Sequence, residues 1–430
     1  MKERFTLKKI NSYIFAKIIT IFILTREIGF FSIPWVIKIY PFHISYYVKK
    51  DICIYIGVIF VFLLLKYKKK FIEIKEKRYY IICLAWIGMI GLTFIMSLVA
   101  YKNESFYMLF KKYYFYEIIA VFFILVFLFR KYKDYYSFFL KSIVYIGTMY
   151  ALFIIIYKIV YEITGLYIFD INYQLIQVRR NTLRLARPAD FISLSCILSF
   201  SFILKQKANK KWVSCFVISL IGVFWVTQTR IYQLAIIISC IIGWLFYTRS
   251  GFIPLIKKYW WVGVIVISPI LIKFIYSFFA SEDLGGTLVR VEGYIYFLQN
   301  IVKNGVIGIG FLANQENTYI LRGPGLKYSL TDLGIVGFIG IFGILGIIFI
   351  GLLLVLFFKS FKNSLKTKSH PEVVILIIYI LITSISVIFN DLQRAIYLPI
   401  YLSILSYCNE IDNKDWRIYE DKIFKNKCCS

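Results

Sequence analysis

Residues 331–357 read TDLGIVGFIGIFGILGIIFIGLLLVLF, and this stretch decides the class of fold. After Asp332 it contains no charged residue, and it exceeds the roughly 20 residues that a helix needs to cross the hydrocarbon core of a membrane. Other apolar stretches recur along the chain near residues 10–29, 51–66, 79–100, 113–129, 138–162, 188–204, 212–228, 231–247, 260–280, 373–389 and 396–408. The sequence therefore predicts about 12 transmembrane helices.

The composition agrees with a membrane protein. Of the 430 residues, 60% are hydrophobic and only 17% are charged, and the mean hydropathy is +0.74. Soluble domains average about 45–50% apolar and about 25% charged residues. These values exclude a soluble enzyme, a secreted disulfide scaffold and a disordered chain. We expect an all-α integral membrane protein that forms a single polytopic domain over residues 1–430.

The charge distribution predicts the orientation. The chain carries 51 Lys and Arg against 23 Asp and Glu, a net charge of +28. With the N-terminus inside, the segments between helices that face the cytoplasm hold most of these cations, as the positive-inside rule requires. Both termini are then cytoplasmic, with residues 409–430 as a cytoplasmic tail. Because the cations face anionic lipid and no nucleic-acid motif is present, we expect membrane lipid and no nucleic acid as a partner.

Histidine and cysteine give no motif. The two histidines, His43 and His370, are isolated in the sequence, and none of the eight cysteines forms a CxxC pair. We expect both histidines to be incidental. The sequence thus predicts no metal site, no cofactor and no disulfide framework.

Arginine is distributed differently from lysine. Five arginines lie on segments predicted inside, whereas nine lie on segments predicted outside: Arg26, Arg179, Arg180, Arg184, Arg187, Arg230, Arg290, Arg322 and Arg394. The planar guanidinium suits the oxygens of phosphate and stays charged in a half-apolar site. For any single arginine, binding of a lipid headgroup explains the position equally well. The set as a whole favours an external site for phosphate or pyrophosphate.

Two predicted outside segments are long. Residues 163–187 form a basic loop that contains Arg179, Arg180, Arg184 and Arg187, and residues 281–330 form a large external loop between the ninth and tenth helices. Within the second loop, one face of a helix would carry Arg290, Tyr294, Phe297, Leu298 and Ile301, a pattern typical of an amphipathic helix on a membrane surface.

Carboxylates accompany the arginines on the predicted outer face. They are Asp170, Asp190, Glu282, Asp283, Glu292, Glu316, Asp332 and Asp391. Arginines that stabilise a leaving pyrophosphate, with one carboxylate that takes a proton from a sugar hydroxyl, suffice for glycosyl transfer without a metal. Asp332 at the start of the tenth helix is a candidate base, and an ordinary helix N-cap is the equal alternative.

Several segments in order resemble one family. Arg290-Val291-Glu292-Gly293-Tyr294, followed by Gly308-Ile309-Gly310-Phe311, resembles the arginine helix and GxG segment of the O-antigen polymerase and ligase superfamily. Thr227-Gln228-Thr229-Arg230, between two helices, is similar to the family's external turn. Further similar segments are Arg184 to Pro188, Glu316-Asn317-Thr318-Tyr319, and Asp332 to Gly337.

The resemblance implies a bacterial plasma-membrane polymerase that joins undecaprenyl-pyrophosphate-linked oligosaccharide units. It implies pyrophosphate contacts from Arg230 and Arg290, which with Asp332 and Glu316 are the candidate catalytic residues. The candidate substrate-binding residues are Arg180, Arg184, Arg187, Arg322 and Glu292. A chain-length regulator is a candidate partner.

Three alternatives remain. A ligase of the same superfamily relies on a histidine in the large external loop, and residues 281–330 contain none. A flippase for the lipid-linked oligosaccharide would carry charges within its helices and show internal repeats. The basic residues assigned to the predicted helices, Lys17, Lys141, Lys158 and Lys273, are scattered, and no repeat is evident. A sugar acyltransferase would need a membrane-embedded histidine.

Overall fold

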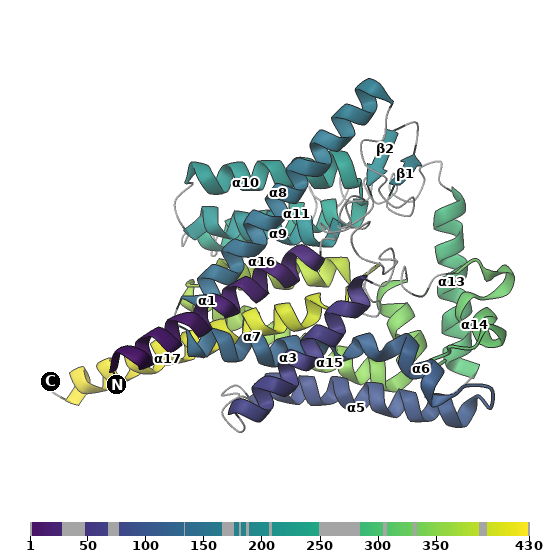
Figure 1. Ribbon diagram of the computed structural model, residues 1–430, viewed down its shortest axis with the longest axis horizontal. Coiled ribbons are helices and arrows are strands. Elements are labelled where there is room, and N and C mark those ends of the chain that lie inside the picture. Colours follow the sequence, from purple (N-terminus) through teal and green to yellow (C-terminus); the bar gives the residue numbers. More distant parts are fainter. Residues whose placement is uncertain are drawn as a thin grey trace. The chain divides into compact units, whose positions relative to one another are not determined.

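Helices make up nearly all of the described chain in the computed structural model (Figure 1). The structure describes residues 2–27, 48–67, 77–132, 134–165, 176–179, 182–185, 189–205, 209–248, 284–303, 308–328, 330, 333–386 and 394–428. The helices fall into two compact units, residues 1–73 with 120–240 and residues 74–119 with 241–430. Each unit is described by itself.

Among the described residues, six helical segments are long and apolar enough to cross a membrane. They are Lys77–Ala100, Phe106–Lys131, Tyr135–Thr164, Lys210–Thr227, Arg230–Tyr247 and Gly334–Thr367. Shorter apolar helical stretches occupy Ser12–Thr25, Cys53–Tyr67 and Pro371–Thr383. Helices also occupy the predicted spans near 188–204 and 396–408, whereas the span near 260–280 lies outside the described residues. The chain is a helical membrane protein, and the total of 12 spans stays a prediction.

The first unit is a bundle in which α8, α9 and α10 pack together. Small residues allow this close approach: an added Cβ at Gly147 of α8 would lie 2.4 Å from the Cβ of Ser195 on α9. The elements of this unit are α1 (Lys2–Glu27), α3 (Val48–Tyr67), α7 (Ala120–Lys131), α8 (Tyr135–Thr164), β1 (Ile176–Arg179), β2 (Thr182–Leu185), α9 (Ala189–Lys205), α10 (Lys210–Ile221), the π-helical turn η3 (Gly222–Thr227) and the first part of α11 (Arg230–Thr248).

The predicted basic loop 163–187 contains strands that the sequence did not predict. β1 and β2 form an antiparallel hairpin in which Gln177 pairs with Arg184 and Arg179 with Thr182. Figure 1 shows the hairpin beside the end of α8. The sequence Thr182-Leu183-Arg184-Leu185 alternates polar and apolar residues, as in a half-buried strand. Four residues between two long helices are too few for this alternation to predict a strand.

The second unit is organised around α15 (Gly334–Thr367), which packs against α5, α13, α16 and α17. Trp86 of α5 anchors this packing, because its ring lies 5.2 Å from Phe349 and 6.3 Å from Phe338 of α15. The other elements of this unit are α5 (Lys77–Ala100), α6 (Phe106–Tyr113), η2 (Tyr114–Ile119), α13 (Leu284–Lys303), η5 (Gln315–Asn317), α14 (Thr318–Arg322), η6 (Pro324–Leu326), α16 (Pro371–Thr383) and α17 (Tyr397–Cys428).

The structure adds detail to two predicted helices. The last predicted span, 396–408, and the predicted tail that follows it form one helix, α17, which runs to Cys428. In α13, Phe297 is buried, whereas Leu298 and Arg290 are exposed, and the placement of this helix on a membrane surface stays a prediction. The buried stripe runs from Gly293 to Phe297, because α13 packs on α15 through these residues.

Each unit contains a contact between two segments that the sequence predicts at the inner face. In the first unit, Lys131 donates to Tyr67 at 2.6 Å, and the sequence predicts both residues at the inner face. In the second unit, Asn409 donates to Ser360 at 2.8 Å, again between two predicted inner ends. Segments predicted at the outer face also meet one another, as the candidate sites below show.

Candidate functional site

In the first unit, Arg184 fastens the basic hairpin to the turn before α11. Its Nε donates to the carbonyl of Thr227 at 2.8 Å, and its Nη2 donates to the hydroxyl of Thr229 at 3.3 Å. Strand β2 and the turn 227–230, both of which the sequence predicts on the outer face, therefore lie together. A guanidinium has five N–H groups, and these two bonds use two of them.

The turn itself has an unusual backbone. It follows the π-helical segment Gly222–Thr227, and Gln228 adopts a left-handed conformation with φ of 50°. A π-helical turn and a non-glycine residue with positive φ are both uncommon and are frequent at functional sites. Arg230 then begins α11 and is half-buried. Because the first N–H groups of a helix are unsatisfied, Arg230 stands at a helix end that favours anions.

Two further polar groups near this turn bind protein atoms. Lys158 of α8 is fully buried and donates to the carbonyl of Trp225 at 2.8 Å, with Glu162 at 3.6 Å. The hydroxyl of Tyr232 donates to the carboxylate of Asp190. Lys158 thus supports the irregular π-helical backbone, and Asp190 orients the start of α11.

In the second unit, residues 308–310 fill a break in α15. Gly343 interrupts that helix with φ of 58° and ψ of −136°. The N–H groups of Ile309 and Gly310 donate to the carbonyls of Gly340 and Ile341 at 2.8 and 2.9 Å. These carbonyls precede the break, and an unsatisfied carbonyl at membrane depth would cost several kcal/mol. Gly308 is required here because an added Cβ would lie 2.5 Å from the nitrogen of Gly343.

Glu104 clamps the residues that follow. Its carboxylate is only 7% exposed and accepts hydrogen bonds from the backbone N–H groups of Ala313 and Asn314 and from the side chain of Asn317, each at about 3.0 Å. These charge-assisted bonds fix the path of residues 313–317. We call residues 308–317 the clamped segment.

The residues around α6 hold the same segment. Lys112 and the hydroxyl of Tyr113 donate to the carbonyl of Leu312 at 2.6 and 2.9 Å. Tyr101 donates to the carbonyl of Ile309 at 3.0 Å, and burial, with additions from Tyr319, Glu104 and Tyr296, raises the pKa of Tyr101. Because its hydroxyl stays protonated, Tyr101 acts as a donor over the whole neutral range.

The sequence did not single out Glu104 as a site residue. A signal was present, since Glu104 is the sole acidic residue in the stretch 77–116, which is otherwise basic and apolar. Glu104 lies in the short segment between the predicted spans 79–100 and 113–129, and its partners lie about 210 positions away in the sequence.

The structure describes six of the nine candidate site residues, and it distributes them between the two units. In the first unit, Arg184 binds the turn that precedes Arg230. In the second unit, Glu316 accepts from Asn103 at 2.8 Å and Glu292 accepts from Tyr328 at 3.4 Å, while Arg290 and Arg322 are exposed. The remaining candidates, Asp332, Arg180 and Arg187, lie outside the described residues.

Each unit presents arginine that would suit an anionic substrate. The first presents half-buried Arg230 at a helix start, and the second presents exposed Arg290 and Arg322. No protein-family model matches the chain, and no curated protein matches it. The fold and composition place the chain in the class of helical integral membrane proteins.

Proposed function

We propose that this protein is a membrane glycosyltransferase that joins undecaprenyl-pyrophosphate-linked oligosaccharide units into a longer polysaccharide on the outer face of a bacterial plasma membrane. The proposal rests on the resemblance to O-antigen polymerases. The observation that supports it best is the bond from Arg184 to Thr227 and Thr229, because it joins two segments that the resemblance assigns to pyrophosphate binding.

In the proposed reaction, the resemblance makes Arg230 in the first unit and Arg290 in the second unit each a candidate contact for the pyrophosphate of a lipid-linked unit. A sugar hydroxyl of another lipid-linked unit attacks the anomeric carbon, and the bond from that carbon to the pyrophosphate oxygen breaks. The guanidinium groups stabilise the charge that develops on the leaving pyrophosphate. A carboxylate accepts the proton of the attacking hydroxyl, and Glu316 and Asp332 are the candidates.

The clamped segment supports an enzyme more than a transporter. A flippase has to open its substrate path alternately to the two faces of the membrane. Residues 308–317 are instead held in place by several hydrogen bonds to buried or half-buried groups. Lys158, the buried cation within a described helix, binds the carbonyl of Trp225. That contact gives Lys158 a structural role, so it does not favour the flippase.

Deletion of the gene in its host, followed by analysis of the undecaprenyl-linked sugars on each membrane face, tests the proposal. A polymerase predicts single repeat units on the outer face and no polymer. Single units confined to the inner face would show a flippase instead. Polymer of normal length in the deletion strain would contradict both functions.

Complementation with variants then tests the assigned residues. Arg230→Ala and Arg290→Ala should each abolish chain growth while the protein still inserts in the membrane. Arg78→Ala is the matched control, since Arg78 is an exposed arginine at the predicted inner end of α5. Full-length polymer from both test variants would refute the pyrophosphate assignment.

A further inference from the structure

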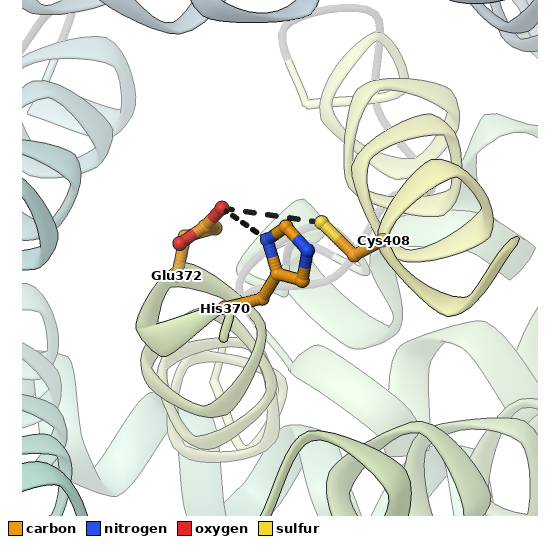
Figure 2. Close-up of side chains that lie close together, drawn as sticks. All are labelled: His370, Glu372 and Cys408. Carbon is orange, nitrogen blue, oxygen red and sulfur yellow. Dashed lines mark hydrogen bonds and ion pairs between the residues drawn. The ribbon is translucent and has the colours of Figure 1, made fainter. Parts of the chain in front are cut away.

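Three residues that could ligate a metal meet between α16 and α17 in the second unit. Figure 2 shows that His370, Glu372 and Cys408 point toward one another. The Nδ1 atom of His370 lies 3.1 Å from Oε1 of Glu372, and the same oxygen lies 3.9 Å from the sulfur of Cys408. All the ligand atoms lie within 4.8 Å of one another.

The local sequence fixes this arrangement. Pro371 is the first residue of α16, where its fixed φ suits the start of a helix, so His370 and Glu372 flank a rigid helix start. The hydroxyl of Ser364, on the last turns of α15, donates to the carbonyl of His370 at 2.9 Å. Cys408 approaches from α17, an element far away in the sequence.

All three side chains are withdrawn from solvent. His370 is 9% exposed, Glu372 is 1% exposed and Cys408 is fully buried. A carboxylate in such a place is costly unless a positive charge or hydrogen bonds compensate it. The set contains one imidazole, one carboxylate and one thiol, which are the three ligand types that zinc prefers.

A fourth residue, Asp412, lies on the other side of the His370 ring. Asp412 lies one helical turn beyond Cys408 on α17 and is 2% exposed. Its Oδ1 lies 3.9 Å from Nε2 of His370, the ring nitrogen opposite Glu372, and it accepts a hydrogen bond from Ser369. Its Oδ2 is buried without a hydrogen-bond partner among the described residues. A carboxylate behind the second nitrogen of a metal-binding histidine is the common arrangement, because it fixes the tautomer.

We propose that His370, Glu372 and Cys408 bind one divalent zinc-type ion, with His370 Nδ1, the Glu372 carboxylate and the Cys408 sulfur as ligands and Asp412 as the carboxylate that orients His370. A tetrahedral zinc ion with bonds of about 2.0–2.3 Å separates its ligand atoms by roughly 3.5 Å. The two measured separations to Glu372, 3.1 and 3.9 Å, bracket that value. On binding, Cys408 releases its thiol proton and His370 releases its Nδ1 proton, both to water, and the sulfur and Nδ1 then form bonds to the metal.

The ion would join the α15–α16 turn to α17. Its ligands come from both elements, so occupancy should stabilise the second unit by linking segments about 36 residues apart. This role is independent of the proposed glycosyl transfer, since every ligand lies on segments predicted at the inner face.

A proton is the competing occupant. Burial lowers the pKa of His370, but Cys408 and Glu372 raise it more strongly, and the net result is a pKa of about 10. A metal ion that binds Nδ1 has to displace this proton. Metal content therefore has to be measured directly.

Metal analysis of the full-length protein in detergent tests the proposal. The protein is incubated with zinc, passed over a chelating resin and analysed for bound metal. We expect about one equivalent for the wild type and for Cys83→Ser, and less than about a fifth of that for Cys408→Ser. Cys83 is the matched control because it is a buried cysteine of α5 in the same unit. Equal metal in Cys408→Ser and the wild type, or none in the folded wild type, would overturn the proposal.

Cobalt supplies a spectroscopic signature that a structural hydrogen bond would not produce. Loading with Co²⁺ should give a thiolate-to-cobalt charge-transfer band in the wild type and in Cys83→Ser, and the band should vanish in Cys408→Ser. If the Cys408 variant fails to fold, thermal unfolding of the wild type with and without zinc replaces this comparison. A melting temperature that zinc leaves unchanged would then refute the site.

Discussion

The turn at residues 227–230 and the clamped segment 308–317 both belong to regions where the sequence predicts pyrophosphate binding, yet the protein holds them in opposite ways. At the turn, a candidate arginine is itself structural, because Arg184 donates to Thr227 and Thr229. At the clamped segment, Glu104 and the residues around α6 supply the hydrogen bonds, and Arg290 lies exposed on a separate helix. In the second unit, substitution of Glu104 should therefore lower stability and substitution of Arg290 should lower activity. In the first unit, substitution of Arg184 should lower both.

The largest effect on stability is expected from Glu104→Ala. The substitution leaves the N–H groups of Ala313 and Asn314 and the amide of Asn317 without their acceptor, at roughly 1–3 kcal/mol for each buried donor. We expect a loss of about 3 kcal/mol or more in the free energy of unfolding, measured by thermal unfolding in detergent. The control is Glu316→Ala, because Glu316 is exposed and accepts from Asn103, so it should cost less than about 1 kcal/mol. Equal melting temperatures for the two variants would show that Glu104 does not clamp the segment.

Arg290→Ala should show the opposite behaviour. Loss of one group that stabilises a leaving anion lowers a rate by about 10²–10³-fold, equivalent to about 3–4 kcal/mol of transition-state stabilisation. Because Arg290 is exposed on α13, the melting temperature should stay within about 1 °C of the wild type. Polymer length in complemented cells and unfolding of the purified protein give the two readings. A large drop in melting temperature would place Arg290 among the structural arginines and remove the contrast with Arg184.

How well the sequence predicts each helix depends on the length of its apolar run. Runs such as residues 334–357 are apolar over more than a membrane thickness, and helix α15 occupies this run as predicted. The break at Gly343 could not be predicted, because the run contains several glycines and only the partner segment 308–310 shows which one interrupts the helix. Hydropathy therefore predicts that a membrane span exists, but it does not predict where the helix is interrupted.

In the candidate site, too, the sequence predicted local features better than contacts between distant segments. The turn 227–230 is short and local, so its position between two helices was confirmed. Glu104 and the group His370, Glu372 and Cys408 depend on contacts between distant segments, which no spacing rule captures. For that reason the sequence treated His370 as isolated, whereas in the structure its Nδ1 atom lies 3.1 Å from Glu372.

A glycine substitution probes the clamped segment through its backbone. Gly308→Ala places a methyl group 2.5 Å from the backbone of Gly343 in a residue with φ of 76°, so both strain and a clash result. We expect a loss of about 2–3 kcal/mol in the free energy of unfolding, with reduced chain growth. The control is Gly165→Ala, since Gly165 has φ of 68° but nothing within 4 Å of the added atom, and it should cost about 1 kcal/mol.

Comparable losses for the two glycine variants would mean that the positive φ alone matters. The packing of residues 308–310 against the break in α15 would then contribute little to stability. A larger loss for Gly308→Ala would show that the break and the segment stabilise each other.

The smallest effect, and the one that tests the contrast most directly, is expected from Arg184→Lys. Lysine keeps the positive charge, but a single ammonium cannot reproduce the fork of a guanidinium that binds both Thr227 and Thr229. If Arg184 acts by holding the turn, the lysine variant should lose about 1 kcal/mol of stability and about tenfold in chain growth, nearly as much as Arg184→Ala. If Arg184 acts mainly as a charge near pyrophosphate, lysine should restore chain growth while alanine abolishes it. Melting temperature and polymer length are measured for both variants. Lysine retains the charge of arginine but not its two bonds to the turn. A loss that both variants share would therefore follow from the geometry of the turn.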